Sequence, residues 1–89
     1  MPGFTHEVEV LDPIGLHARP ASQIVKLVKE ADVNLTIGRP GSESMSAKSA
    51  LMLMSMKVKT GEKLILTFEN TDEVSASNIA SQIQEYLKG

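Results

Sequence analysis

Two hydrophobic periods alternate along this chain of 89 residues, and their order restricts the fold more than any other feature. Apolar and polar residues alternate with the period of a half-buried strand in residues 4–10, 33–37 and 63–68, and residues 42–46, which follow a turn, predict a further short strand. Apolar residues recur instead with helical spacing from Ala18 and again behind Asn70, which predicts two long helices. A short apolar run that starts near Ser49 predicts a short helix between them. The predicted element order is therefore β-α-β-β-α-β-α.

The same alternation predicts how the elements pack. Strands with one apolar face belong to a sheet that is buried on one side only, which is typical of antiparallel sheets. The apolar stripes of the helices must cover that side, so we expect an α+β open-faced sandwich with a four-stranded antiparallel sheet and three helices on one face. Residues 1–89 are expected to form a single domain. For the last helix, Asn70 and Glu73 have the spacing of an N-terminal capping box.

Composition excludes several classes of function. The chain has no cysteine and two histidines, which excludes disulfides and leaves too few ligands for a closed zinc site, so we expect neither a metal nor a cofactor. Its net charge of −2, with one Tyr and two Phe, argues against nucleic acid as a partner. No apolar stretch approaches the roughly 20 residues of a membrane span, and the N-terminus lacks a signal-peptide pattern. We therefore expect a cytoplasmic protein, without membrane insertion, that binds other proteins or a small anionic group.

The segment from Gly15 to Ser22 follows a break in the pattern at residues 12–15 and combines a candidate nucleophile with the start of a helix. If His17 lies near the N-cap, the backbone N–H groups of Ala18 and Arg19 lack intrahelical acceptors. Pro20 fits the first turn that follows, because a backbone N–H in that turn would have no intrahelical acceptor. Free N–H groups, the positive end of the helix dipole and the Arg19 guanidinium together predict an anion-binding site.

His17 is the one nucleophile of this chain suited to take up and release a phosphoryl group near neutral pH, because a neutral imidazole carries a nitrogen lone pair. The N–H groups of Ala18 and Arg19 and the Arg19 side chain would meet the charge of that group. The alternative is that His17 is an imperfect N-cap of an ordinary helix. The segment holds no second His, Asp or Glu to complete a triad or a metal site. On the residues alone, both interpretations stay open.

The same segment resembles a known signature. Gly15–Ala21 matches the active-site motif of HPr, the phosphocarrier family of the bacterial phosphoenolpyruvate-dependent sugar phosphotransferase system. Ala47–Ser49, followed by the run Leu51–Ser55, resembles the second motif of that family. The resemblance covers essentially the whole chain, including its element order. It implies an open-faced β-sandwich with four strands and three helices, and a carrier rather than an enzyme in the strict sense.

The resemblance also implies roles for individual residues. His17 matches the histidine that phospho-enzyme I phosphorylates on Nδ1 and that donates to sugar-specific IIA proteins or domains, and Arg19 matches the arginine that contacts the phosphoryl group. Ser49 matches a serine that HPr kinase/phosphorylase modifies in many Gram-positive bacteria to regulate carbon catabolite repression through a transcription regulator. The second helix lies beside the histidine in the family, and the expected docking residues are Ser22, Gln23, Ala50, Leu51, Met54 and Ser55.

Three positions depart from the family pattern. Ile14 stands where a small polar residue is usual, so a hydrogen bond near the site is expected to be missing. Met52 and Lys57 stand where Gram-positive members often have glycine, which weakens the case for kinase recognition of Ser49.

Other functions stay open beside the sugar-branch carrier. A carrier of the nitrogen-related phosphotransferase branch would use the same chemistry with different partners. A regulatory adaptor would act mainly through Ser49, and a structural α+β binding module would require the first motif to be a coincidence. His6 shares the apolar face of the first strand and is interpreted as a structural histidine. A monomer is expected.

Overall fold

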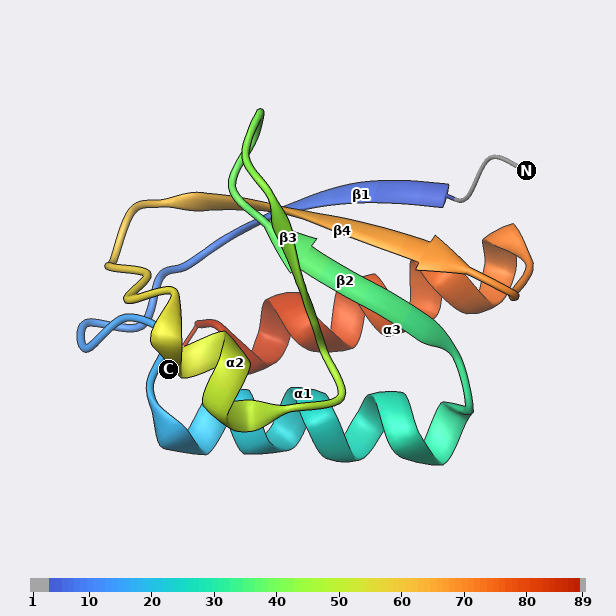
Figure 1. Ribbon diagram of the computed structural model, residues 1–89, viewed down its shortest axis with the longest axis horizontal. Helices are drawn as coiled ribbons and strands as arrows, with labels where there is room; N and C mark the ends of the chain where they lie inside the picture. The colour runs from blue at the N-terminus through green and yellow to red at the C-terminus, as the bar shows by residue number, and fades with distance from the viewer. Residues whose placement is uncertain (1–3, 89) are drawn as a thin grey trace.

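The computed structural model of this chain describes residues 4–88 and has the predicted element order (Figure 1). The predicted strands are confirmed to within two residues at each end. The third strand is the one that is clearly shorter than predicted, because Ser42 still belongs to the turn, where its N–H donates to the Arg39 carbonyl at 3.0 Å. The elements are β1 (Phe4–Glu9), α1 (Ala18–Ala31), β2 (Asn34–Gly38), β3 (Ser44–Ser46), α2 (Ala50–Ser55), β4 (Lys63–Glu69) and α3 (Glu73–Tyr86).

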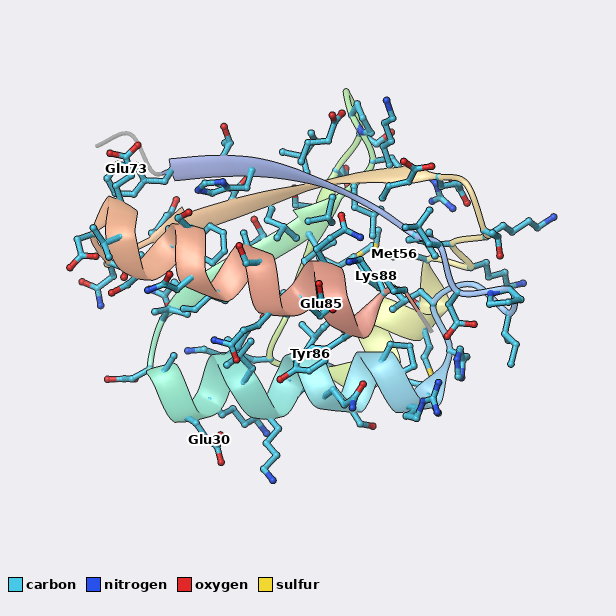
Figure 2. The ribbon with its side chains drawn as sticks, turned by 180° about the vertical axis from the view of Figure 1, so that it is seen from behind. Glu30, Met56, Glu73, Glu85, Tyr86 and Lys88 are labelled. Atoms are coloured by element: carbon cyan, nitrogen blue, oxygen red, sulfur yellow. The ribbon has the colours of Figure 1, made fainter. Side chains whose placement is uncertain are left out.

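All four strands form one antiparallel sheet in the order β1-β4-β2-β3. The strand β4 is central, and in its two pairings Val8 of β1 lies opposite Leu64 while Leu35 of β2 lies opposite Phe68. The sheet forms the upper layer in Figure 1, with the three helices below it, and Figure 2 shows α1 and α3 on this same side from behind. The predicted open-faced sandwich is confirmed.

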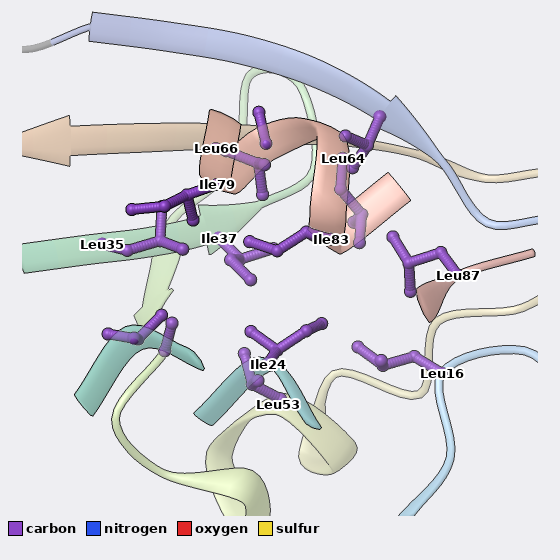
Figure 3. Close-up of a cluster of buried hydrophobic side chains, with 14 of the residues drawn as sticks. Leu16, Ile24, Leu35, Ile37, Leu53, Leu64, Leu66, Ile79, Ile83 and Leu87 are labelled. Carbon is purple, nitrogen blue, oxygen red and sulfur yellow. The ribbon is translucent and has the colours of Figure 1, made fainter. Parts of the chain in front are cut away.

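The hydrophobic core fills the space between the sheet and the helices (Figure 3). Leu64, Leu66 and Phe68 of β4 are at most 1% exposed, whereas the residues between them are not buried. Ile24 of α1 and Ile83 of α3 close the core from the helix side. Burying one such side chain stabilises the fold by about 1.5–3 kcal/mol. This one-sided burial is the physical cause of the period-two pattern in the sequence.

The start of α3 differs from the predicted capping box. Asn70 is not the cap, because it lies in the turn after β4 with a left-handed φ of 62°. The N-cap is Asp72, whose side chain accepts the backbone N–H of Ser75 at 2.7 Å. A short acidic side chain at this position satisfies one of the free amides of the first turn. The prediction of a cap at Asn70 paired with Glu73 was therefore wrong.

Candidate functional site

His17 lies where the loop after β1 meets the start of α1. It is the N-cap residue of α1, with extended backbone angles of φ −113° and ψ −171°, and its side chain caps no backbone group. The side chain is 26% exposed, so the ring is accessible at the surface. Within residues 4–88 no acceptor binds the N–H groups of Ala18 and Arg19, and the next N–H, that of Ala21, donates to the His17 carbonyl at 3.1 Å. The predicted helix start, with free amides at it, is confirmed.

The loop before His17 is held against the segment that follows α2. The N–H of Gly15 donates to the Asp12 carbonyl at 2.9 Å, and the N–H of Leu16 donates to the Val58 carbonyl at 3.0 Å. Gly15 has a φ of 94°, and a Cβ placed on it would lie 2.5 Å from the Val58 oxygen. Glycine is required here, because both the backbone angle and the close approach exclude a side chain.

The partner of the His17 ring is Asp12, five residues earlier in the chain. Asp12 is 2% exposed. Its Oδ2 lies 2.9 Å from His17 Nε2, and its Oδ1 accepts the N–H of Ile14 at 2.8 Å. Its own N–H donates to the Leu87 carbonyl at 2.8 Å, and its carbonyl accepts the hydroxyl of Thr60. Asp12 thereby joins the loop after β1 to the end of α3 and to the turn before β4, which meet at the left of Figure 1.

The surroundings of Asp12 keep its carboxyl group ionised. The N–H of Ile14, then the His17 ring and the charge of Arg19, lower the pKa of Asp12 below its ordinary value of 3.8, although burial acts in the opposite direction. An ionised carboxylate can only accept hydrogen bonds, so the contact with His17 assigns the ring proton to Nε2. In the neutral ring the lone pair then lies on Nδ1, the nitrogen that Asp12 does not contact.

Arg19 extends from the first turn of α1 beside the ring. Its Nη2 lies 3.9 Å from Asp12 Oδ2, and its side chain is 65% exposed. Because this contact is long and the guanidinium is exposed to screening by water, it holds Arg19 only weakly, and the guanidinium can turn to an anion bound at His17. Arg19 also lines a shallow depression of about 230 Å³ together with Gln23, Glu85 and Tyr86.

Sequence reasoning missed Asp12. The segment from Gly15 to Ser22 has no acidic residue, and the acidic partner of His17 lies three residues before that segment. The pattern at residues 12–15 was interpreted only as a break. Asp side chains often bond to the backbone N–H two residues further on, and this bond closes a turn. An Asp at the start of a turn that ends just before a histidine is the signal that could have identified it.

Ser49 begins the second helix of the site. The helix predicted to start near Ser49 is confirmed: Ser49 is the N-cap of α2, and its Oγ accepts the N–H of Met52 at 3.2 Å. The helix packs against α1. It directs Leu53 into the core and leaves Leu51 75% exposed. Of the predicted docking residues, those that are exposed are Ser22, Gln23, Leu51 and Ser55, and those that are half-buried against the core are Ala50 and Met54.

The described part of the chain shows neither a metal centre nor a membrane span. Within residues 4–88 no three His, Asp or Glu side chains are grouped so that they could hold a metal ion. None of the helices in this range combines the length and the apolar character that crossing a bilayer requires.

Comparison with known proteins identifies the family. A family model described as the PTS HPr component phosphorylation site matches residues 4–88. This chain belongs to the HPr family. The phosphocarrier protein HPr of Borreliella burgdorferi is 40% identical over 73 residues, which are 81% of this chain and 84% of that protein. The phosphocarrier protein HPr of Mycoplasma pneumoniae is 34% identical over 79 residues, 89% of this chain and 90% of the relative. The crystal structure of HPr-C-His from Thermoanaerobacter tengcongensis superposes with a TM-score of 0.80 at 27% identity, over 97% of this chain and 96% of the other.

As a member of the HPr family the chain is a phosphocarrier of the phosphotransferase system rather than a catalyst. The structure shows the surroundings of two residues that depart from the HPr pattern, Lys57 and Ile14. Lys57 has a left-handed φ of 54°, a conformation that favours glycine, which agrees with the glycine expected here in Gram-positive members. The Ile14 side chain is 72% exposed, and Ile14 enters the site only through its backbone N–H, which binds Asp12.

Proposed function

We propose that this HPr-family protein accepts a phosphoryl group from phospho-enzyme I on Nδ1 of His17 and passes it to sugar-specific IIA proteins or domains. The observation that carries the proposal is the hydrogen bond between His17 Nε2 and Asp12, because it turns the nucleophilic lone pair of the ring to the nitrogen that is not engaged. A neutral imidazole nitrogen in an accessible ring is a competent phosphoryl acceptor near neutral pH. The reaction is proposed to take place in the cytoplasm, with the carrier as a monomer.

The surroundings of the ring support an anionic group on His17. The N–H groups of Ala18 and Arg19 are free at the N-terminus of a helix of 14 residues, where the helix dipole favours negative charge. The Arg19 guanidinium supplies a full positive charge that can hydrogen-bond to phosphoryl oxygens. We propose that these groups stabilise the charge on the phosphoryl oxygens while the group is bound.

Ser49 is proposed as the site of regulatory phosphorylation by an HPr kinase/phosphorylase, with a catabolite-control transcription regulator as the further partner. As the N-cap of α2 it can carry a phosphate without loss of the fold, because helix-start amides interact favourably with negative charge. The added charge would lie two residues before the exposed Leu51, where we expect enzyme I to dock. A carrier of the nitrogen branch, or a protein acting mainly through Ser49, are the alternatives.

The test uses the two histidines as a matched pair. The parent, His17→Ala and His6→Gln proteins are incubated with phosphoenolpyruvate, Mg²⁺ and enzyme I of either the sugar or the nitrogen branch, and the bound phosphate is tested for acid lability and base stability. His6 is half-buried, with its ring 5.8 Å from that of Phe68, so circular dichroism must show that its variant is folded.

We expect acid-labile phosphate on the parent and on His6→Gln and none on His17→Ala, with the faster reaction from the sugar-branch enzyme I. Acid-labile phosphate on a folded His17→Ala protein would contradict the assignment to His17. A faster reaction with the nitrogen-branch enzyme would favour that alternative.

A further inference from the structure

We propose that Asp12 is a positioning residue for phosphoryl transfer, which holds the ring proton of His17 on Nε2 and thereby presents the Nδ1 lone pair to the donor. The inference rests on the proposed function of His17, and it adds a residue that lies outside the recognised Gly15–Ala21 motif. It deepens that function by assigning a cause to the choice between the two ring nitrogens.

The two oxygens of the Asp12 carboxylate have separate partners, and this fixes its orientation. Oδ1 accepts the N–H of Ile14 at 2.8 Å and Oδ2 contacts His17 Nε2 at 2.9 Å. A carboxylate tilted out of the plane of these two contacts would lose both hydrogen bonds. Because Asp12 is 2% exposed, water has little access to replace either partner. The ring of His17 is therefore held by a charged acceptor of set direction, in surroundings where a charge-assisted hydrogen bond is strong.

The backbone of Asp12 is anchored from elements far apart in the sequence. Its N–H donates to the carbonyl of Leu87, and its carbonyl accepts the hydroxyl of Thr60 and the N–H of Gly15. The aspartate is thus supported by the end of α3, by the turn before β4 and by its own loop.

The chemistry of the transfer step is assisted by a carboxylate in this position. The Nδ1 lone pair forms the new bond to phosphorus, while the bond between phosphorus and the leaving atom of the donor breaks and its electron pair stays with the donor. The proton on Nε2 stays in place, so the ring becomes a cation as the N–P bond forms. Asp12 stabilises that positive charge, and since the reverse step passes through the same charged ring, it assists donation as well as acceptance. The phosphoryl group on Nδ1 and the carboxylate at Nε2 lie on different edges of the ring, which limits their repulsion.

The decisive variant is Asp12→Asn, because the amide has the shape of the carboxylate but replaces one acceptor oxygen with an NH₂ group, which donates. Its oxygen is required by the N–H of Ile14, so its NH₂ group faces His17 Nε2 and can only donate. The ring must then carry its proton on Nδ1, which removes the lone pair from the reacting nitrogen. Asp72→Asn is the matched control, because Asp72 also accepts a backbone N–H in a turn but lies at the start of α3.

The first measurement is the ¹⁵N NMR spectrum of the His17 ring at alkaline pH, where the ring is neutral; no phosphoryl donor is needed. We expect the proton on Nε2 in the parent and in Asp72→Asn, and on Nδ1 in Asp12→Asn. The second measurement is the rate of phosphoryl acceptance from phospho-enzyme I. We expect Asp12→Asn to lower this rate by at least about 10-fold, the effect of removing a residue that hydrogen-bonds a metal-ligating histidine. The loss can reach about 10⁴-fold, the effect of holding a catalytic histidine in the wrong tautomer.

A parent ring protonated on Nδ1 would overturn the proposal, and so would an Asp12→Asn protein that accepts phosphate at the parental rate. If Asp12→Asn does not fold, the tautomer of the parent decides. The proposed function fails separately, through acceptance by His17→Ala, and neither outcome can be mistaken for the other.

Discussion

Gly15 provides a sharp test of how the site is built, because the chain contains a nearly ideal control for it. Gly15 and Gly61 have almost the same backbone angle, with φ of 94° and 91°. A Cβ on Gly15 would lie 2.5 Å from the Val58 oxygen and 3.2 Å from the Lys59 Cα, whereas a Cβ on Gly61 would meet nothing within 4 Å. Gly15→Ala and Gly61→Ala therefore share the cost of the backbone angle and differ in the clash.

The expected free energies follow from these two contributions. A side chain at positive φ costs about 1–2 kcal/mol, and the loss of glycine entropy in the unfolded chain offsets about 0.4–1 kcal/mol of this. We therefore expect Gly61→Ala to lower the free energy of unfolding by about 1 kcal/mol. At Gly15 the neighbouring atoms are backbone and cannot move aside alone, so the overpacking adds about 1–3 kcal/mol. Gly15→Ala should thus lower the free energy of unfolding by about 3 kcal/mol in total.

The assay is urea denaturation of the two variants and the parent at one pH, followed by circular dichroism. A domain of this size unfolds in a single transition, so the difference in free energy can be read directly. Gly15→Ala should also accept phosphate more slowly, because the clash displaces the loop that carries both Asp12 and His17. Equal destabilisation by the two substitutions would refute the close approach between Gly15 and Val58.

Three further predictions address other parts of the molecule. Arg19→Ala should keep the stability of the parent and slow the acceptance of the phosphoryl group by about 5- to 150-fold, which corresponds to a charge-assisted contact of about 1–3 kcal/mol. Unchanged kinetics with both enzyme I and a IIA partner would remove Arg19 from the site. Ser49→Asp should slow phosphorylation by enzyme I, and raised salt should restore part of the rate by screening; a variant as fast as the parent at low salt would leave Ser49 as a helix cap only. The hydrogen bond from Arg39, followed by that from the Lys59 N–H, lowers the pKa of Glu62 from 4.5 to about 2, so this pair stabilises the fold above pH 4.5 and the gain is lost as the pH falls toward 2. Thermal melting of Glu62→Gln should therefore depend less on pH across that window than melting of the parent, and identical pH dependence would contradict the ion pair.

The fold could be predicted from the sequence because its signals are local. Leu64, Leu66 and Phe68 alternate with half-exposed residues, and burial on one face of the sheet is what produces such a pattern. The N-cap at His17 was predictable for a similar reason, since a change of period and a proline in the first turn both mark a helix start. The short helix near Ser49 had a weaker signal, an apolar run without clear periodicity, and the structure shows that Ser49 is its N-cap.

The parts that could not be predicted depend on contacts between distant segments. A local turn signal could have suggested that Asp12 meets His17, but no local pattern indicates that the backbone of Asp12 is bound by Leu87 and Thr60. Arg39 lies in the turn between β2 and β3, and its guanidinium reaches Glu62 at 2.6 Å and the Met56 carbonyl at 2.9 Å. These contacts connect that turn to the turn before β4 and to the end of α2, and no local pattern predicts them.

The misplaced cap of α3 has a more local cause. Two acceptor side chains, Asn70 and Asp72, both precede the helix, and both residue types favour turns and N-caps. Spacing alone indicated Asn70 as the cap instead of Asp72. Asn70 follows directly after β4, where the chain leaves the sheet in a left-handed conformation, and this conformation cannot be read from spacing.

The central claim is that the phosphoryl group resides on Nδ1 of His17, the ring nitrogen opposite the Asp12 contact. The most direct measurement is combined ¹⁵N and ³¹P NMR of the ¹⁵N-labelled protein after phosphorylation by phosphoenolpyruvate and enzyme I. We predict one phosphorus coupled to Nδ1 of His17, with the proton still on Nε2. Phosphorus coupled to Nε2, or phosphate found on His6 or Ser49 with His17 unmodified, would contradict the account.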